Sequence, residues 1–133
     1  MANEISVKMV QGLLGFEEIT DYTLKPVPNN SYFFWLEAED GPGFLVTKPG
    51  FFFPQYKIEL EKECIDELHP NVGPIEVYNI ITVPERTADM TANLLAPVFI
   101  NEKEGLARQV VLHDTHYTTR HYLFSPERRR SCG

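Results

Sequence analysis

Turn-forming residues interrupt this chain at short intervals, and that spacing limits its possible folds more than any other feature. The 10 prolines and 8 glycines are spread through the 133 residues and do not gather in a linker. Each therefore marks a turn or the end of a strand. The segments between them are short and rich in β-branched and aromatic residues, which favour strands. The pattern predicts a single all-β domain over residues 1–133, mostly antiparallel and built as a small β-barrel or a sandwich.

Eight segments have the side-chain pattern of strands. Residues 22–27 alternate between apolar and polar side chains, as a strand with one buried face does. Residues 32–36 form a continuous apolar and aromatic run, which predicts a strand buried on both faces. The other expected strands cover residues 44–47, 56–60, 75–83, 94–100, 106–113 and 120–124. Polar turns at residues 39–43 and 101–105 join neighbouring segments, so we expect two β-hairpins.

One short helix is expected near residues 61–69. Leu60, Cys64, Ile65 and Leu68 recur at helical spacing and share one face, with acidic residues mostly elsewhere. Pro70 prevents the helix from extending further.

The charge of the chain restricts its partners and its compartment. A formal net charge of −7 argues against direct binding of nucleic acid and would speed encounter with a basic protein. The exception to this negative charge is the basic run Arg128–Arg130, so we interpret residues 125–133 as a disordered basic tail.

No apolar run approaches the ~20 residues that span a membrane, and no secretory signal pattern begins the chain. Cys64 and Cys132 form no Cys-x-x-Cys pair, which fits a reducing cytoplasm.

Three histidines, His113, His116 and His121, come nearest to a metal site. Residues three apart in a strand point to opposite faces, so His113 and His116 converge only if residues 114–115 turn. No cysteine lies nearby to complete a structural zinc set. The chain also has no glycine-rich phosphate loop, Gly-x-Ser-x-Gly turn or Cys/His dyad spacing. We therefore interpret these histidines as turn and surface residues, and expect no metal, no cofactor and no catalytic residue.

The aromatic cluster Phe51, Phe52, Phe53 and Tyr56 is the clearest candidate for a binding surface. Successive side chains of a strand alternate between its faces, and Pro54 limits regular pairing. The rings therefore cannot all face the core, and exposed aromatic residues often serve as binding anchors. The cluster could instead pack into the core, and comparable unfolding by Phe52→Ala and Phe34→Ala would identify it as core.

Residues 90–101 carry the most distinctive string of the chain, Met-Thr-Ala-Asn-Leu-Leu-Ala-Pro-Val-Phe-Ile-Asn. It resembles the "TANLLAP-(I/V)-x-IN" block of the bacterial flagellar assembly factor FliW family. Further blocks resemble that family in the same order: Gly-Leu-Leu-Gly-Phe-Glu at 12–17, Ser-Tyr-Phe-Phe-Trp-Leu at 31–36, Val-Thr-Lys-Pro at 46–49, Phe-Pro-Gln-Tyr at 53–56, Asn-Ile-Ile-Thr-Val-Pro at 79–84, Gln-Val-Val-Leu at 109–112 and Tyr-Thr-Thr-Arg-His at 117–121. Together they cover almost all of residues 12–121. Residues 1–11 depart from the pattern and read as a shortened N-terminal segment, so we expect the first strand of the family to be short or absent.

The resemblance implies a non-catalytic partner switch. FliW-like proteins bind flagellin in the cytoplasm, and they also bind CsrA, a dimeric RNA-binding repressor of flagellin translation. Free FliW sequesters CsrA and relieves the repression, whereas accumulated flagellin occupies FliW and releases CsrA. A monomer suffices for this activity.

Four polar residues join the aromatic cluster as candidate contacts. Asn93 and Asn101 flank the apolar part of the distinctive string, although a side chain that holds a turn is their more ordinary role. Glu17 and Glu18 form an exposed acidic pair suited to a basic partner. The alternative function is that of a small β-barrel enzyme or ligand-binding protein, with a pocket lined by Trp35, Phe44 or Tyr78.

Overall fold

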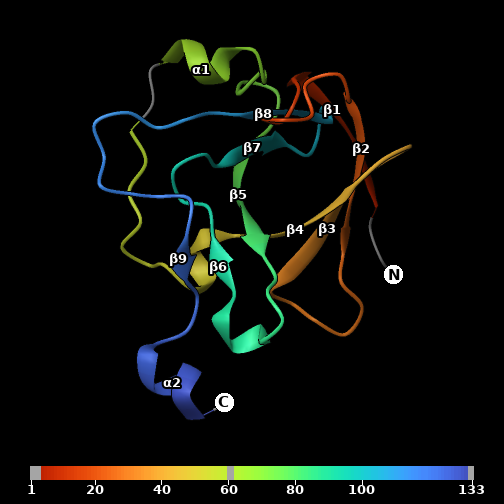
Figure 1. The fold of residues 1–133 in the computed structure, drawn as a ribbon. Coiled ribbons are helices and arrows are strands. Elements are labelled where there is room, and N and C mark those ends of the chain that lie inside the picture. Colours follow the sequence, from red (N-terminus) through yellow and green to blue (C-terminus); the bar gives the residue numbers. More distant parts are fainter. Residues whose placement is uncertain (1–3, 60–61, 132–133) are drawn as a thin grey trace.

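The computed structural model describes residues 4–59 and 62–131, and its strands form one sheet that closes into a barrel (Figure 1). The strands are β1 (Ile5–Gln11), β2 (Asp21–Pro26), β3 (Phe33–Ala38), β4 (Gly43–Thr47), β5 (Ile75–Thr82), β6 (Thr91–Ala92), β7 (Val98–Asn101), β8 (Leu106–Gln109) and β9 (His121–Tyr122). Their order is β4-β3-β2-β1-β8-β7-β5-β6-β9, and a further β4–β5 pairing closes the first seven into a ring. The expected all-β, mostly antiparallel barrel is confirmed.

Two features of the sheet make closure possible. Strand β5 changes partners along its length: Tyr78 is paired with Val98 of β7, whereas Ile81 is paired with Leu45 of β4 and Ala92 of β6. On the other side of the ring β1 lies parallel to β8, while the other pairings are antiparallel. The short strands β6 and β9 continue the sheet beyond the ring from the end of β5.

Side chains from alternate strand positions fill the barrel. The interior is apolar and closely packed, and it includes Val7, Met9, Tyr22, Leu24, Leu36, Val46, Tyr78, Val98, Ile100 and Ala107. Outside the barrel a second cluster gathers Ile81, Met90, Ala92, Leu94 and Leu123. Strand β3 contributes to both, because Leu36 lies in the barrel and Phe33 packs on the second cluster. Its aromatic residues are only half-buried, so the expectation of full burial on both faces holds in part.

The N-terminal segment contains a complete strand of the barrel. Residues 5–11 are the full strand β1, paired with β2 on one edge and β8 on the other. The physical reason lies in the alternation of Val7 and Met9, which are buried, with Ser6 and Lys8, which are exposed.

One expected strand is missing and three are shorter: β8 ends at Gln109 within the expected 106–113, and β9 covers only His121–Tyr122 of the expected 120–124. Residues 56–59 form no strand, because Tyr117 Oη, and not a neighbouring strand, accepts the Lys57 backbone N–H; residue 60 lies outside the described residues. The strand expected over 94–100 begins only at Val98, since the side chain of Asn93 binds the backbone of the preceding turn. Both expected hairpins, β3–β4 and β7–β8, are present.

Two short α-helices complete the described chain. Helix α1 spans Lys62–Asp66, inside the segment where the sequence predicts it. Helix α2 spans Pro126–Ser131, where a disordered basic tail was expected, so that expectation is wrong for these residues. Two contacts order the segment: Ser125 Oγ accepts the Arg128 N–H at 3.2 Å, and the Arg129 guanidinium lies 3.6 Å from the centre of the Tyr122 ring. Neither helix is long and apolar enough to cross a membrane.

Candidate protein-binding surface

An exposed pair of aromatic rings lies at the open end of the β3–β4 hairpin, opposite its turn. Tyr32, just before β3, is 51% exposed, and Phe51, at the end of the 3-10 helix η1 (Pro49–Phe51), is 44% exposed. Their ring centroids lie 5.2 Å apart in an edge-to-face arrangement. Exposed aromatic residues that support one another in this way make large rigid contact areas at low entropic cost.

The rest of the phenylalanine run turns toward the protein. The helical turn at η1 points successive side chains in different directions, whereas a strand would alternate them between two faces. Phe52 packs against Phe33 and Phe124, with ring centroids 5.7 and 6.1 Å away, and joins the cluster outside the barrel. Phe53 is half-buried beside His121. Packing is therefore the main role of Phe52 and Phe53, and Phe51 remains the exposed member.

Two tyrosine hydroxyls hold the segment that follows. Tyr56 Oη donates a hydrogen bond to the Leu94 carbonyl at 2.6 Å, and Tyr117 Oη accepts the Lys57 N–H at 3.0 Å. The two tyrosine rings meet edge to face at 4.7 Å. Burial raises the pKa of Tyr56 to about 12, so its phenol keeps the proton that it donates.

A shallow groove runs beside these tyrosines. One hollow of about 440 Å³ is lined by Phe53, Tyr56, Leu94, His116, Tyr117 and His121. A second hollow of about 330 Å³ shares Gln55, His116 and Tyr117 with the first and continues along residues 112–117. The groove begins beside the phenylalanine run, whose first member, Phe51, forms the exposed pair with Tyr32. It adds aromatic and imidazole side chains to the candidate surface.

The histidines of this region line the groove. His121 Nε2 accepts the Thr118 N–H at 2.8 Å, and His116 stacks on Tyr117 with ring centroids 4.4 Å apart. Within the described residues, no group of three or more histidines, cysteines or carboxylates is placed to hold one metal ion. Burial, and then the neighbouring His116, lower the pKa of His121.

Acidification is expected to destabilise the protein through His121. Its folded-state pKa lies below the unfolded value near 6.5, so the unfolded chain binds this proton more readily. Stability should therefore fall as the pH drops through about 6.5 toward the folded-state pKa. Melting temperatures measured between about pH 7.5 and 5.5 should decline less in His121→Gln than in the parent. Equal slopes in parent and His121→Gln would contradict the expectation.

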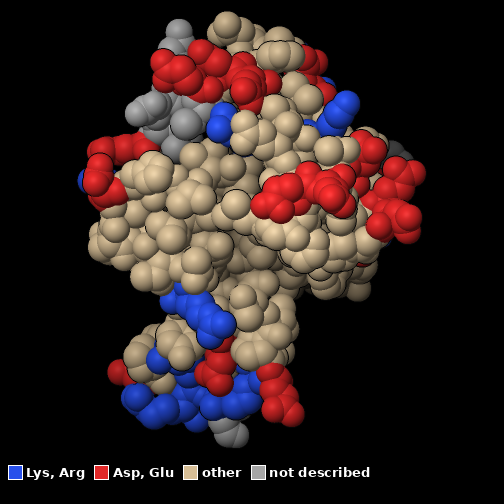
Figure 2. Space-filling model, turned by 45° about the horizontal axis from the view of Figure 1, so that its top comes forward, with Lys and Arg blue, Asp and Glu red and all other residues tan. Residues whose placement is uncertain are grey.

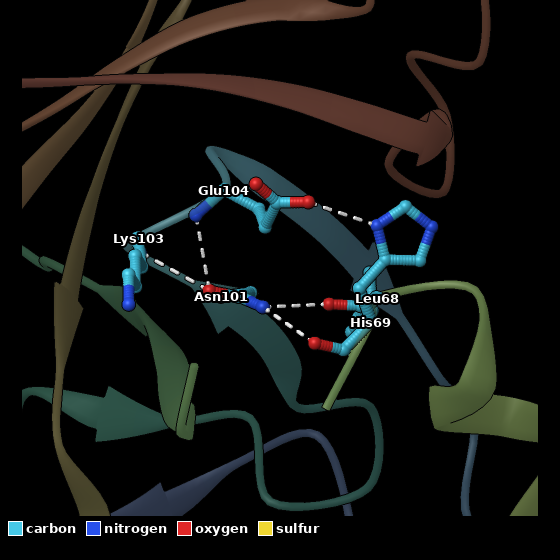
Figure 3. Close-up of polar contacts among 5 residues, drawn as sticks. All are labelled: Leu68, His69, Asn101, Lys103 and Glu104. Atoms are coloured by element: carbon cyan, nitrogen blue, oxygen red, sulfur yellow. Dashed lines mark hydrogen bonds and ion pairs between the residues drawn. The ribbon is translucent and has the colours of Figure 1, made fainter. Parts of the chain in front are cut away.

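Asn101 is a buried structural residue and not a surface contact (Figure 3). Its Nδ2 donates to the carbonyls of Leu68 and His69 at 2.8 and 3.0 Å, and its Oδ1 accepts the N–H groups of Lys103 and Glu104 at 3.1 Å. An ion pair of 3.0 Å between His69 and Glu104 lies beside these bonds. The side chain is 0% exposed, so a direct contact between Asn101 and a partner is ruled out in this fold.

As Asn101 does, Asn93 accepts two backbone N–H groups through its side-chain oxygen. Its Oδ1 accepts the N–H groups of Leu95 and Ala96 at 3.1 and 2.9 Å, and its backbone carbonyl accepts Asn79 Nδ2. The residue is half-buried, and its side chain serves the turn that separates β6 from β7.

Glu17 and Glu18 lie apart from the aromatic surface. Both are exposed in the β1–β2 connection, where Phe16 packs on Phe44 near the start of β4. The register pairs Phe33 with Thr47 at one end of the β3–β4 hairpin and Glu37 with Gly43 at the other. Since Tyr32 and Phe51 adjoin the first end and Phe44 the second, the acidic pair belongs to a separate surface.

The sequence-based candidates omit two residues that complete this surface, Tyr32 and Tyr117. Tyr32 belongs by pattern to the strand that follows it, but the Asn30 side chain accepts its N–H at 2.7 Å and holds it in the turn. A signal for this exists in the Asn-Asn-Ser turn that precedes it. Tyr117 accepts the N–H of Lys57, which lies 60 residues away in the chain, and no local pattern reveals this contact.

Comparisons with known proteins agree on one family. The family model for FliW protein matches residues 1–123. A flagellar assembly factor FliW from Heliobacterium modesticaldum is 38% identical over 92% of this chain and 82% of its own length. The corresponding protein from Bacillus subtilis is 37% identical over 83% of this chain and 79% of its own length. A crystal structure of the flagellar assembly factor FliW superimposes with a TM-score of 0.82 at 33% identity, covering 92% of this chain and 87% of the other.

Proposed function

We propose that this chain, which belongs to the FliW family of flagellar assembly factors, acts in the cytoplasm by binding protein partners and performs no chemistry. The partners are a CsrA-like RNA-binding regulator and flagellin, as the sequence resemblance implies. Capture of the regulator relieves repression of flagellin translation, and flagellin bound to the same protein releases the regulator. The protein works as a monomer and contacts neither nucleic acid nor membrane in this role.

The observation that carries the proposal is the exposed pair Tyr32 and Phe51, together with the groove beside Tyr56 and Tyr117 that is lined by the nearby Phe53. Large exposed aromatic residues are costly in water and are enriched where proteins bind one another. The formal charge of −7 supports the choice of a basic regulator, because opposite charge speeds encounter. Reciprocal exclusion of the two partners follows if they overlap on this surface or if each favours a different conformation.

The alternative of a small-molecule pocket has less support. Tyr78, one of its expected lining residues, lies 1% exposed among packed core side chains. Its hydroxyl donates to Glu102 at 2.5 Å, so this polar group is already bound. Trp35 and Phe44 are half-buried on the strands of the barrel wall.

Titration calorimetry with purified CsrA-type regulator and with flagellin tests the function directly. We expect each partner to bind alone, and saturation with flagellin to reduce binding of the regulator. If neither partner binds at micromolar concentration, the proposed function is wrong. If both bind and neither affects the other, the switching mechanism is wrong while the binding function stands.

The double variant Tyr32→Ala/Phe51→Ala is expected to weaken binding of at least one partner by roughly 100-fold, because truncating an aromatic anchor typically costs about 2 kcal/mol or more. Circular dichroism should show the parental fold, since both rings are about half exposed. Val72→Ala is the matched control, because Val72 is 43% exposed and lies after α1, away from this surface in the chain. Unchanged affinity of the double variant for both partners would place the binding surface elsewhere.

A further inference from the structure

Lysine and arginine side chains, blue in Figure 2, gather at the lower end of this acidic protein, and most of its arginines belong to this group. Five of the six arginines belong to this group, which we term the arginine pole: Arg86, Arg120, Arg128, Arg129 and Arg130. They come from three separate segments, at the 3-10 helix η2 (Thr87–Asp89), before β9, and in α2. Three carboxylates, Glu85, Asp89 and Glu127, lie within three residues of these arginines in the chain, so the pole has a formal charge of +2 and the remainder of the chain −9.

The fold holds the pole in place. Arg86 donates to the carbonyl of Arg129 near the end of α2, and Arg129 Nη1 donates to the Phe124 carbonyl at 2.9 Å. The Arg129 guanidinium also stacks on Tyr122, and the Arg128 guanidinium lies 5.5 Å from the Phe124 ring centre. These contacts fix the basic side chains relative to the sheet, which a solvated tail would leave free to move.

The arginines divide into those that build the pole and those that face outward. Arg86 pairs with Asp89 at 3.7 Å as well as with α2, and Arg129 is half-buried. Arg120 and Arg130 are exposed, and neither guanidinium has an ion-pair partner among residues 4–59 and 62–131. Two unneutralised guanidinium groups on an acidic protein are therefore available to an incoming anion.

A hollow beside Arg120 gives the pole shape as well as charge. Its volume is about 380 Å³, and its lining includes Arg120, Tyr122, Thr82, Thr91 and Asp89. Two threonines and a tyrosine supply residues with hydroxyl groups around the arginine. Asp89, the one carboxylate in the lining, already faces Arg86. An anionic side chain can thus reach Arg120 in a partly enclosed place.

We propose that the arginine pole binds a short segment rich in aspartate and glutamate on a partner protein. Guanidinium groups pair with carboxylates through two parallel hydrogen bonds, which suits a segment of successive acidic side chains. Nucleic acid is negatively charged, as an acidic peptide segment is. A long polyanion, however, would extend beyond the pole over a molecule whose remaining charge is −9, and that charge would repel it. A segment of a few residues stays within the pole. The pole consists of other residues than the Tyr32–Phe51 pair, and its failure would leave the proposed function standing.

Fluorescence anisotropy with a labelled peptide of about ten glutamates tests the proposal at low salt and at roughly 0.3 M salt. We expect binding to the parent that weakens with salt, and at least a tenfold loss in Arg120→Glu/Arg130→Glu. The matched control is Lys8→Glu/Lys103→Glu, which changes the net charge equally at exposed lysines of β1 and of the β7–β8 turn. This control should keep most of the affinity, because its substitutions lie away from the pole.

Several results would overturn the proposal. The first is that the peptide does not bind the parent at low salt. The second is that both double variants lose the same affinity for the peptide. The third is that only the arginine variant loses the parental fold and that this unfolding explains its lost binding. Single-stranded RNA that binds more tightly than the peptide and depends on Arg120 and Arg130 would assign the pole to nucleic acid. Salt-sensitive self-association of the parent, removed by Arg120→Glu/Arg130→Glu, would assign it to a second copy of this chain.

Discussion

Replacement of Asn101 by alanine is expected to lower the free energy of unfolding by about 3 to 4 kcal/mol. Four hydrogen bonds disappear at once, and the backbone groups of Leu68, His69, Lys103 and Glu104 lose the partner that satisfies them. Each buried polar group left without a partner costs on the order of 1–3 kcal/mol, less where water can reach it. The loss is a large share of the ~5–15 kcal/mol that stabilises a typical domain. Urea denaturation followed by circular dichroism measures it.

Asn30 provides the matched control. Its Oδ1 accepts the N–H groups of Tyr32 and Phe33, two and three residues ahead, as Asn101 does, but the turn is exposed. Water can replace the lost acceptor there, so Asn30→Ala should cost only about 1 kcal/mol. Similar losses in both variants would show that the two carbonyls after α1 gain little from Asn101.

Substitution of Gly105 by alanine is expected to destabilise the protein by about 3 kcal/mol or more. Gly105 has a φ of +69°, a conformation that costs other residues roughly 1–2 kcal/mol. An added Cβ would also lie 2.5 Å from the Ser6 carbonyl oxygen, which belongs to the backbone of β1 and cannot move alone. The Gly105 carbonyl accepts the Lys8 N–H at 2.8 Å, so the clash falls where β1 meets β8. The substitution should loosen the barrel at its parallel pairing.

Gly15→Ala separates the two causes. Gly15 also has a positive φ, of +87°, but no atom lies within 4 Å of its added Cβ. It should therefore cost only about 1 kcal/mol, the conformational part alone. Thermal melting of both variants gives the comparison, and hydrogen exchange of the β1 amides should rise only in Gly105→Ala. A Gly105→Ala protein as stable as Gly15→Ala would mean that β1 shifts without loss.

The fold class and the hairpins could be predicted because they depend on local alternation and on turn residues. Residues 22–27 and 75–83 show this pattern clearly, and β2 and β5 lie there. Closure of the sheet depends on β1 meeting β8 and on β5 changing partners, which are contacts between distant segments. Periodicity carries no information about such contacts, so barrel and sandwich remain equal from the sequence.

The errors arise where side chains replace the sheet as partners of the backbone. The alternation at 56–60 is typical of a strand, yet the tyrosine hydroxyl of Tyr117 binds that segment. The basic run at 128–130 is typical of a solvated tail, yet Tyr122 and the Phe124 carbonyl fix Arg129. In the candidate surface, a 3-10 turn determines that Phe51 is exposed and that Phe52 is packed. Tyr32 lies beside Phe51 because a turn in another segment of the chain holds it there.

The parallel pairing of β1 with β8 also bears on how the protein matures during synthesis. Strand β1 leaves the ribosome first, but its edge toward β8 has no partner until residues 106–109 have been made. Residues 5–109 must therefore all emerge before the ring can close, and contacts this far apart in sequence slow folding. A nascent chain without β8 cannot display the finished barrel, so the closed surface becomes available to partners only after β8 has been translated.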